Sequence, residues 1–122
     1  MIKVFISQPM NGKTIDEVKK EREIAIEDLK EKLSDTEFEI IDTVLPDPGL
    51  KPESRSRIFM LGRSIQLLAD ANIMYLYKGW QDSNGCMVEY EIAKRYGIKT
   101  IMSEFDPHKT VIGKRLDAGL WD

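Results

Sequence analysis

The sequence predicts an α/β domain in which a parallel sheet is covered by helices on both faces. Short runs of β-branched and aromatic residues alternate along the chain with longer segments that have helical periodicity. Clusters of glycine, proline and polar residues separate these segments. Strand–helix alternation of this kind implies right-handed crossovers and a parallel sheet. The 42% hydrophobic content of the 122 residues fits a single globular domain, residues 1–122.

Composition and charge exclude several classes of protein. A net charge of −3 and a pI near 5.3 lack the basic footprint that binding of a nucleic acid polymer requires. One cysteine and one histidine allow neither an intrachain disulfide nor a zinc cluster. The opening apolar run, 1–6, is too short for a signal peptide or a membrane span. We therefore expect a soluble, cytoplasmic protein without a membrane partner.

The first half of the chain predicts two strands and one helix. Ile2–Ser7 has strand composition and stops at Gln8-Pro9, because proline cannot donate to a ladder. Thr14 and Glu17 form a capping box, which starts a helix that reaches about Ser34. A second strand is predicted over Phe38–Val44. The prolines of Leu45–Pro52 then forbid regular structure.

The second half repeats this alternation. A helix ending near Asp70, which we interpret as a structural cap, is followed by a strand over Ile73–Tyr77. The loop Gly79–Gly85 leads into a third helix that stops at Gly97, before a strand over Ile98–Met102. The predicted buried stripes are Ile58, Leu61, Ile65 and Leu68 in the second helix, and Val88, Ile92 and Tyr96 in the third.

The predicted strand order is 2-1-3-4, in a three-layer flavodoxin- or Rossmann-like domain of four to five strands. A fifth strand could come only from the unassigned tail, 103–122, where Val111–Gly113 is a candidate edge strand. In this topology ligands bind outside the carboxyl ends of the first and third strands. The polar loops Ser7–Lys13 and Gly79–Gly85 emerge there, and they predict a pocket.

Glu89 is the strongest catalytic candidate. Gly85, Glu89 and Ala93 lie in one row of the third helix, so small neighbours leave the carboxylate recessed and partly desolvated. The competing interpretation is a solvated glutamate favoured by the helix dipole. Ser83 or Asn84 caps this helix, and its free N–H groups predict an anion site.

Several other side chains have both a functional and a structural interpretation. A thiolate at Cys86 would be favoured by the first helical turn, but a packed cysteine is the commoner case. Trp80 could stack a flat ligand or provide ordinary hydrophobic cover. Ser7, Gln8 and Asn11 could bind a sugar or base, or serve turn chemistry. Three arginines could approach a phosphate or remain solvated: Arg55, Arg57 and Arg63.

Four sequence elements occur together in a fixed order. They are the run 6–12 (Ile-Ser-Gln-Pro-Met-Asn-Gly), Ala69-Asp70, Gly79-Trp80, and the pattern 83–93 (Ser-x-Gly-Cys-x-x-Glu-x-x-x-Ala). This combination resembles the nucleoside 2-deoxyribosyltransferase-like superfamily. It looks like a small, largely uncharacterised bacterial and phage branch, related to deoxynucleoside 5′-monophosphate N-hydrolases.

The resemblance implies an N-glycosidic transferase or hydrolase that acts on a deoxynucleoside or its 5′-monophosphate. Glu89 would be the nucleophile of a glycosyl-enzyme intermediate, and Ser83 would bind the phosphate. No metal or cofactor is implied, and relatives form homodimers or larger homo-oligomers. The residues expected to bind substrate are Ser7, Gln8, Met10, Asn11, Gly12, Gly79, Trp80, Ser83, Asn84 and Gly85.

Two positions depart from the resembled pattern. Glu91 replaces a glycine, and Gly62 stands where relatives carry a catalytic aspartate. The missing acid favours an alternative, a non-catalytic nucleotide-binding or sequestering protein of the same fold. A third possibility, a flavodoxin-like protein-interaction module, predicts no small-molecule pocket.

Overall fold

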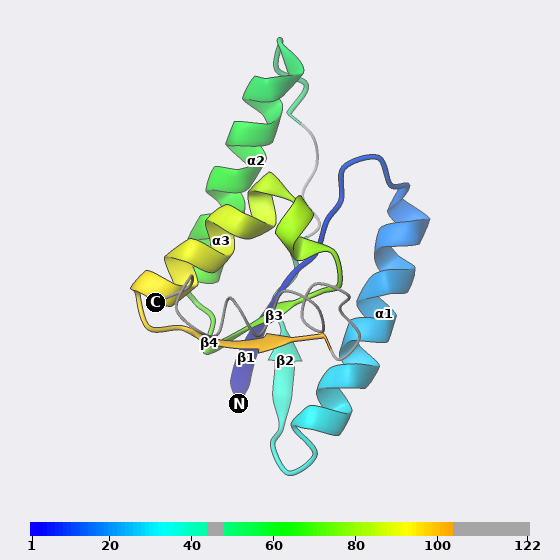
Figure 1. The fold of residues 1–122 in the computed structure, drawn as a ribbon, viewed down its shortest axis with the longest axis vertical. Helices are drawn as coiled ribbons and strands as arrows, with labels where there is room; N and C mark the ends of the chain where they lie inside the picture. The colour runs from blue at the N-terminus through cyan, green and yellow to red at the C-terminus, as the bar shows by residue number, and fades with distance from the viewer. Residues whose placement is uncertain (44–47, 104–122) are drawn as a thin grey trace.

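The computed structural model describes residues 1–43 and 48–103 and contains a parallel sheet in the order β2-β1-β3-β4 (Figure 1). The predicted α/β fold and strand order are thereby confirmed. The fifth-strand candidate, Val111–Gly113, lies outside the described residues. The elements are β1 (Ile2–Ser7), α1 (Ile15–Lys32), β2 (Phe38–Ile40), α2 (Glu53–Leu68), β3 (Ile73–Leu76), the 3₁₀ turn η1 (Trp80–Asp82), α3 (Asn84–Arg95) and β4 (Lys99–Met102).

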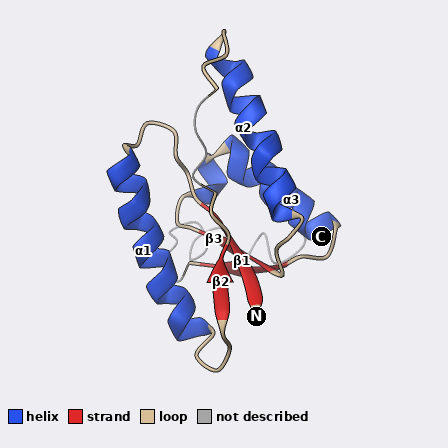
Figure 2. Cartoon of the chain, turned by 180° about the vertical axis from the view of Figure 1, so that it is seen from behind, coloured by secondary structure: helices blue, strands red, loops and turns tan. Residues whose placement is uncertain are grey.

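Helices cover both faces of the sheet, with α1 on one side and α2 and α3 on the other (Figure 2). The side chains of β1 divide between these two layers, because successive residues of a strand point to opposite faces. Val4 and Ile6 pack in the α1 layer, whereas Phe5 packs in the α2–α3 layer. The two apolar cores therefore meet at the central strands.

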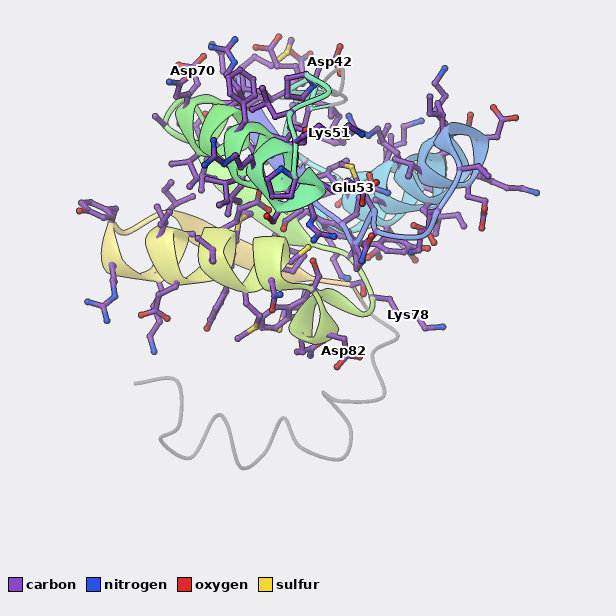
Figure 3. The ribbon with its side chains drawn as sticks, turned by 90° about the horizontal axis from the view of Figure 1, so that it is seen from above. Asp42, Lys51, Glu53, Asp70, Lys78 and Asp82 are labelled. Atoms are coloured by element: carbon purple, nitrogen blue, oxygen red, sulfur yellow. The ribbon has the colours of Figure 1, made fainter. Side chains whose placement is uncertain are left out.

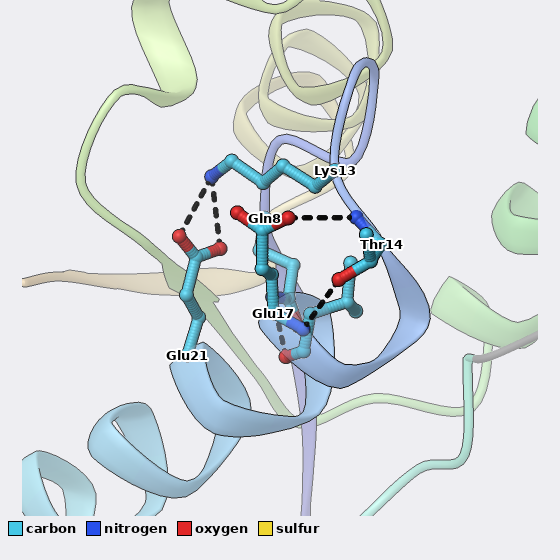
Figure 4. Close-up of polar contacts among 6 residues, drawn as sticks. Gln8, Lys13, Thr14, Glu17 and Glu21 are labelled. Atoms are coloured by element: carbon cyan, nitrogen blue, oxygen red, sulfur yellow. Dashed lines mark hydrogen bonds and ion pairs between the residues drawn. The ribbon is translucent and has the colours of Figure 1, made fainter.

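Local sequence signals account for the starts of two helices. Thr14 Oγ1 accepts from the Glu17 N–H at 3.1 Å, and Glu17 Oε1 accepts from the Thr14 N–H at 3.1 Å, so the predicted capping box is formed (Figure 4). Ser83 caps α3, where its hydroxyl accepts from the Cys86 N–H at 3.3 Å. These bonds satisfy amide groups that a helix start leaves without a partner.

The predicted end of the second strand needs correction. β2 is shorter than predicted, since it spans Phe38–Ile40 rather than Phe38–Val44. The Ile41 N–H still donates to the Val4 carbonyl at 2.9 Å, after which residues 42–43 leave the regular ladder.

Within the described residues, no helix combines the length and the apolar character that crossing a bilayer requires.

The buried face of α3 differs from the predicted stripe. Val88 is 40% exposed and Tyr96 is 80% exposed, whereas the buried residues are Cys86, Glu89, Tyr90 and Ala93. The small residues in this set let α3 approach β3 and β4 closely. Ile92, the third residue of the predicted stripe, is partly buried and packs against the core, so helical spacing of apolar residues was wrong at Val88 and Tyr96.

The predicted stripe of α2 is only partly buried. Leu68 is fully packed, but Ile58 is 70% exposed near the start of the helix, which extends away from the sheet (Figure 1). Figure 3 shows Asp70 and Glu53 at opposite ends of α2. Asp70 forms an ion pair with Lys3 at 3.1 Å. Lys3 lies at the amino end of β1, so this contact is at the opposite edge of the sheet from the predicted pocket.

We expect Ala93→Leu to lower the free energy of unfolding by about 1–3 kcal/mol, because Ala93 is fully buried and a larger side chain overpacks the core. Tyr96→Ala should change it by less than about 0.5 kcal/mol, since Tyr96 is exposed. Urea unfolding of the two variants measures both values. A larger loss for Tyr96→Ala than for Ala93→Leu would contradict the observed face of α3.

Candidate functional site

A cavity of about 470 Å³ opens where β1 ends, between the first two turns of α3 and one face of α2. Its volume lies in the ~300–1,000 Å³ range of small-molecule sites. It also lies at the switch point between β1 and β3, where the fold predicts ligand binding. The lining residues are Phe5, Ile6, Gln8, Met10, Asn11, Thr43, Ser54, Arg57, Ile58, Met60, Leu61, Ser64, Ser83, Asn84, Gly85, Cys86 and Glu89.

The Glu89 carboxylate is buried at the wall of this cavity. Its residue is only 7% exposed, and its Oε1 accepts a hydrogen bond from the Ser7 hydroxyl at 2.7 Å. Ser7 ends β1 and points to the same face as Phe5, because the two are two residues apart in a strand. That face is covered by α3, so the alternation of β1 brings Ser7 to Glu89.

Burial controls the acidity of Glu89. Loss of hydration raises the pKa of Glu89 from 4.5 to about 7, although the hydrogen bond from Ser7 opposes this shift. Near pH 7 both the protonated and the ionised form of Glu89 are therefore populated. The recessed carboxylate predicted from the row of small residues is present, and the solvated alternative is wrong.

Cys86 lies one turn before Glu89 and also lines the cavity. Burial raises the pKa of the Cys86 thiol, while the hydroxyl groups of Ser7 and Ser83 act in the opposite direction. The thiol is 2% exposed and packs in the core between the sheet and α3. The packed interpretation of Cys86 therefore fits better than that of an activated thiolate.

The start of α3 and one face of α2 give the cavity positive character. Ser83, Asn84 and Gly85 place the amino end of α3 at its wall. α2 lies close to the amino end of α3: Leu61 Cδ1 is 4.0 Å from the position that a Cβ on Gly85 would occupy. Arg57 stands one helical turn before Leu61 and also lines the cavity. An anionic group is the ligand that these features favour.

The structure brings most of the predicted residues together, with four exceptions. Ser7 does not line the cavity but bonds to Glu89 instead. Gly12 and Gly79 adopt positive φ angles of 79° and 89° in the two loops and are not part of the cavity wall. The predicted residues that do line it are Gln8, Met10, Asn11, Ser83, Asn84, Gly85 and Glu89.

Trp80, the fourth exception, is a core residue rather than a stacking platform. It is 1% exposed, and its ring lies 4.9 Å from that of Tyr90 at an interplanar angle of 44°. The 3₁₀ turn η1 follows the left-handed Gly79 and directs the indole beneath α3. The interpretation of Trp80 as hydrophobic cover is the correct one.

Sequence reasoning missed the contribution of Thr43 and of several α2 side chains, including Ser54, Met60 and Ser64. The sequence predicted no more for Arg57 than for the two other arginines that could approach a phosphate. Its spacing with Leu61 and Ser64, at i, i+4 and i+7, places these residues on one face of a helix. That spacing was visible in the sequence, but only the packing of α2 shows that this face borders a cavity.

A second cavity, of about 720 Å³, lies on the α1 side of the sheet. Its wall includes Asp28, which pairs with Lys32 at 2.8 Å and accepts from the Tyr75 hydroxyl. It contains none of the loop residues predicted to bind substrate. The smaller cavity, which holds a buried carboxylate of raised pKa, is therefore the candidate site.

Comparisons with known proteins give one match. A family model described as a domain of unknown function (DUF4406) matches residues 2–102, which include every predicted site residue. No curated protein and no solved structure matches the chain. In the part of the chain that the structure describes, no group of three or more His, Cys, Asp or Glu side chains could hold a metal ion.

Glu89 is expected to make stability depend on pH. Its pKa in the folded protein lies above its ordinary value, so the native state keeps a proton that the unfolded chain has lost between pH 4.5 and 7. The free energy of unfolding should therefore fall as the pH rises through this range. Glu89→Gln removes the effect, so the variant should exceed the wild type by up to about 3 kcal/mol above pH 7 and by little near pH 4.5.

Urea unfolding at pH 5 and pH 8 measures this difference. Glu91→Gln is the matched control, because Glu91 lies on the same helix but is only half-buried and pairs with Arg95 at 2.7 Å. A stability gain of Glu89→Gln that is equal at the two pH values would contradict the raised pKa.

Ser7→Ala should raise the pKa of Glu89 further, because the Ser7 hydroxyl favours the ionised carboxylate. Carbon-13 NMR of the glutamate carboxyl groups follows this titration directly and needs no activity. Ser103→Ala, which alters another buried serine, at the end of β4, should leave the titration unchanged. An unshifted Glu89 pKa in Ser7→Ala would mean that the Ser7 hydrogen bond does not govern this carboxylate.

Proposed function

Since the chain belongs to the DUF4406 family, a domain of unknown function, we propose its function from its own residues. The proposed activity is cleavage or transfer of the N-glycosidic bond of a deoxynucleoside or its 5′-monophosphate, with Glu89 as the nucleophile. One observation carries this proposal: a buried carboxylate with a pKa of about 7 faces a small-molecule cavity at the switch point of the sheet. The motif around Glu89 resembles the nucleophile motif of nucleoside 2-deoxyribosyltransferases.

The cavity suits such a ligand in shape and polarity. Apolar walls from Phe5, Met60 and Leu61 could contact a base or a sugar ring. The amino end of α3 and the guanidinium of Arg57 would attract a 5′-phosphate. Glu89 lies within two helical turns of the amino end of α3. A ligand whose phosphate binds at that end would therefore bring its sugar near the Glu89 carboxylate.

The proposed reaction has two balanced steps. A carboxylate oxygen of Glu89 forms a bond to the anomeric carbon while the carbon–nitrogen bond breaks, and the base leaves with the bonding electrons and takes a proton from solvent. Water or a ring nitrogen of a second base then attacks the anomeric carbon, displaces the carboxylate and loses its proton to solvent. This step restores ionised Glu89 and gives net retention of configuration. Only the ionised form of Glu89 can attack, so the rate should rise with pH through about 7.

A specific observation also supports the alternative, a nucleotide-binding protein without catalysis. Among the described residues that line the cavity, Glu89 supplies the one carboxyl group, so no second carboxyl is present to protonate the leaving base. Gly62, where relatives carry an aspartate, is exposed and lies outside the cavity wall. Cytoplasmic location and assembly into a homodimer or larger homo-oligomer remain predictions from the sequence.

Release of free base distinguishes the two functions. The wild-type protein is incubated with deoxynucleosides and their 5′-monophosphates, and free base is measured by chromatography. We expect Glu89→Gln to abolish base release, because the amide is not a nucleophile, while ligand binding by calorimetry is kept. Glu91→Gln should retain the wild-type rate, since Glu91 lies outside the cavity wall, is half-buried on α3 and is paired with Arg95.

Two results would overturn the enzymatic proposal. Wild-type protein that binds these ligands but releases no base would establish the binding alternative instead. Base release that survives in Glu89→Gln would exclude Glu89 as the nucleophile.

A further inference from the structure

Ser7 places a buried hydroxyl on a face of β1 that otherwise packs in an apolar core. The Ser7 residue is 1% exposed, and Phe5, on the same face of the strand, belongs to the core beneath α2 and α3. A buried hydroxyl destabilises a fold unless it forms a hydrogen bond. Ser7 forms this bond with the Glu89 carboxylate, at 2.7 Å between Ser7 Oγ and Glu89 Oε1.

The backbone on both sides of this hydroxyl is fixed. Ser7 pairs with Leu76 in the parallel ladder of β1 and β3, and its carbonyl accepts from the Tyr77 N–H at 2.9 Å. The next residue, Gln8, is held to α1 by a bond from its Nε2 to the Val18 carbonyl at 3.1 Å (Figure 4). These contacts fix the Cβ of Ser7, so a single torsion, χ1, sets the position of its oxygen.

The Cys86 thiol also lies within hydrogen-bonding reach of the Ser7 hydroxyl. Burial raises the pKa of this thiol, so it stays protonated near neutral pH and can donate to Ser7 Oγ. The Ser7 hydroxyl has one proton, which it directs to Glu89 Oε1. Both groups beside the hydroxyl therefore favour the orientation in which Ser7 donates to Glu89.

The two carboxylate oxygens of Glu89 have different surroundings. Oε1 accepts the bond from Ser7, whereas Oε2 forms no hydrogen bond with a described residue. Oε2 is also not one of the fully buried polar atoms that lack a partner, so it reaches accessible surface. Glu89 lines the cavity, and Oε2 is therefore the oxygen that a ligand there can contact.

We propose that Ser7 is a positioning residue for the reaction of Glu89: its bond to Oε1 holds the carboxylate so that Oε2 faces the substrate and attacks the anomeric carbon. This inference rests on the proposed function for the reaction. Oε2 forms the new bond to carbon while the base leaves with the bonding electrons and takes a proton from solvent. Ser7 does not line the cavity, so it acts through Glu89 and not by contact with the substrate.

Single-turnover base release, measured from pH 5 to pH 9 with the protein in excess of a deoxynucleoside 5′-monophosphate, tests this role. The rate constant rises as Glu89 ionises and reaches a limit once every molecule is ionised. A change in the pKa alone moves the midpoint of this curve and keeps the limit. We expect Ser7→Ala to lower the limit itself by about ten- to a hundredfold, because the released carboxylate loses its attacking geometry.

The other titratable side chains that the structure places in the cavity wall are Cys86 and Arg57. They keep their charge over this range, because burial raises the pKa of the thiol and a guanidinium titrates only above about pH 12. The limit therefore reports on Glu89. The half-saturating protein concentration should change by less than about twofold in Ser7→Ala, since a residue that acts only in the transition state leaves substrate binding intact.

Two further variants separate the hydroxyl from its packing. Ser7→Thr keeps the hydroxyl on a side chain that suits a strand, and should restore the limit to within about threefold of the wild type. Ser103→Ala removes the hydroxyl of a buried serine outside the cavity wall and should give the wild-type curve.

Three results would overturn the role of Ser7. A wild-type limit in Ser7→Ala, with only the midpoint moved, would mean that Ser7 controls acidity alone, and the proposed function would stand. An equally low limit in Ser7→Ala and Ser7→Thr would assign the loss to packing, and again leave the proposed function intact. Absence of base release from the wild type with every deoxynucleoside and 5′-monophosphate would overturn both proposals.

Discussion

The alternation of side chains along β1 is the constraint on which the rest of the molecule depends. β1 lies inside the sheet, between β2 and β3, and is covered on both faces. Its residues therefore serve the two cores in turn, with Val4 and Ile6 toward α1 and Phe5 toward α2 and α3. Where the strand ends, the same alternation sends Ser7 to α3 and Gln8 to α1. Two consecutive polar residues thus bond to different helices: Gln8 lines the cavity, and Ser7 bonds to Glu89, which lines it.

Two opposing effects set the pKa of Glu89. Burial raises it to about 7, whereas the hydrogen bond from the Ser7 hydroxyl lowers it. The loss of hydration is the larger of the two effects. A carboxylate kept at the boundary between its two charge states suits a nucleophile or a proton-sensitive ligand contact. Burial of this carboxylate lowers the stability of the fold above its pKa, which is a cost that functional residues often carry.

Several features could be predicted from the sequence because they depend on neighbouring residues. The capping box of Thr14 and Glu17, the cap at Ser83 and the recessed row of Gly85, Glu89 and Ala93 follow from spacing within one helix. The parallel sheet followed from the alternation of strands and helices, and the order 2-1-3-4 was predicted as that of flavodoxin-like domains. The stripe of Val88 and Tyr96 was wrong, because apolar residues also occur on exposed surface and small residues made the closer contact with the sheet.

The sequence by itself determined the α/β fold, the loops that meet at the carboxyl ends of β1 and β3, and Glu89 as the candidate within them. Only the tertiary structure decided that Ser7 pairs with Glu89, 82 positions away, and that Trp80 belongs to the core. It also decided that the Gln8 amide is held by α1 with its oxygen unpartnered. The physical reason is that spacing along a chain specifies local geometry, whereas burial and hydrogen-bond partners depend on which elements pack together.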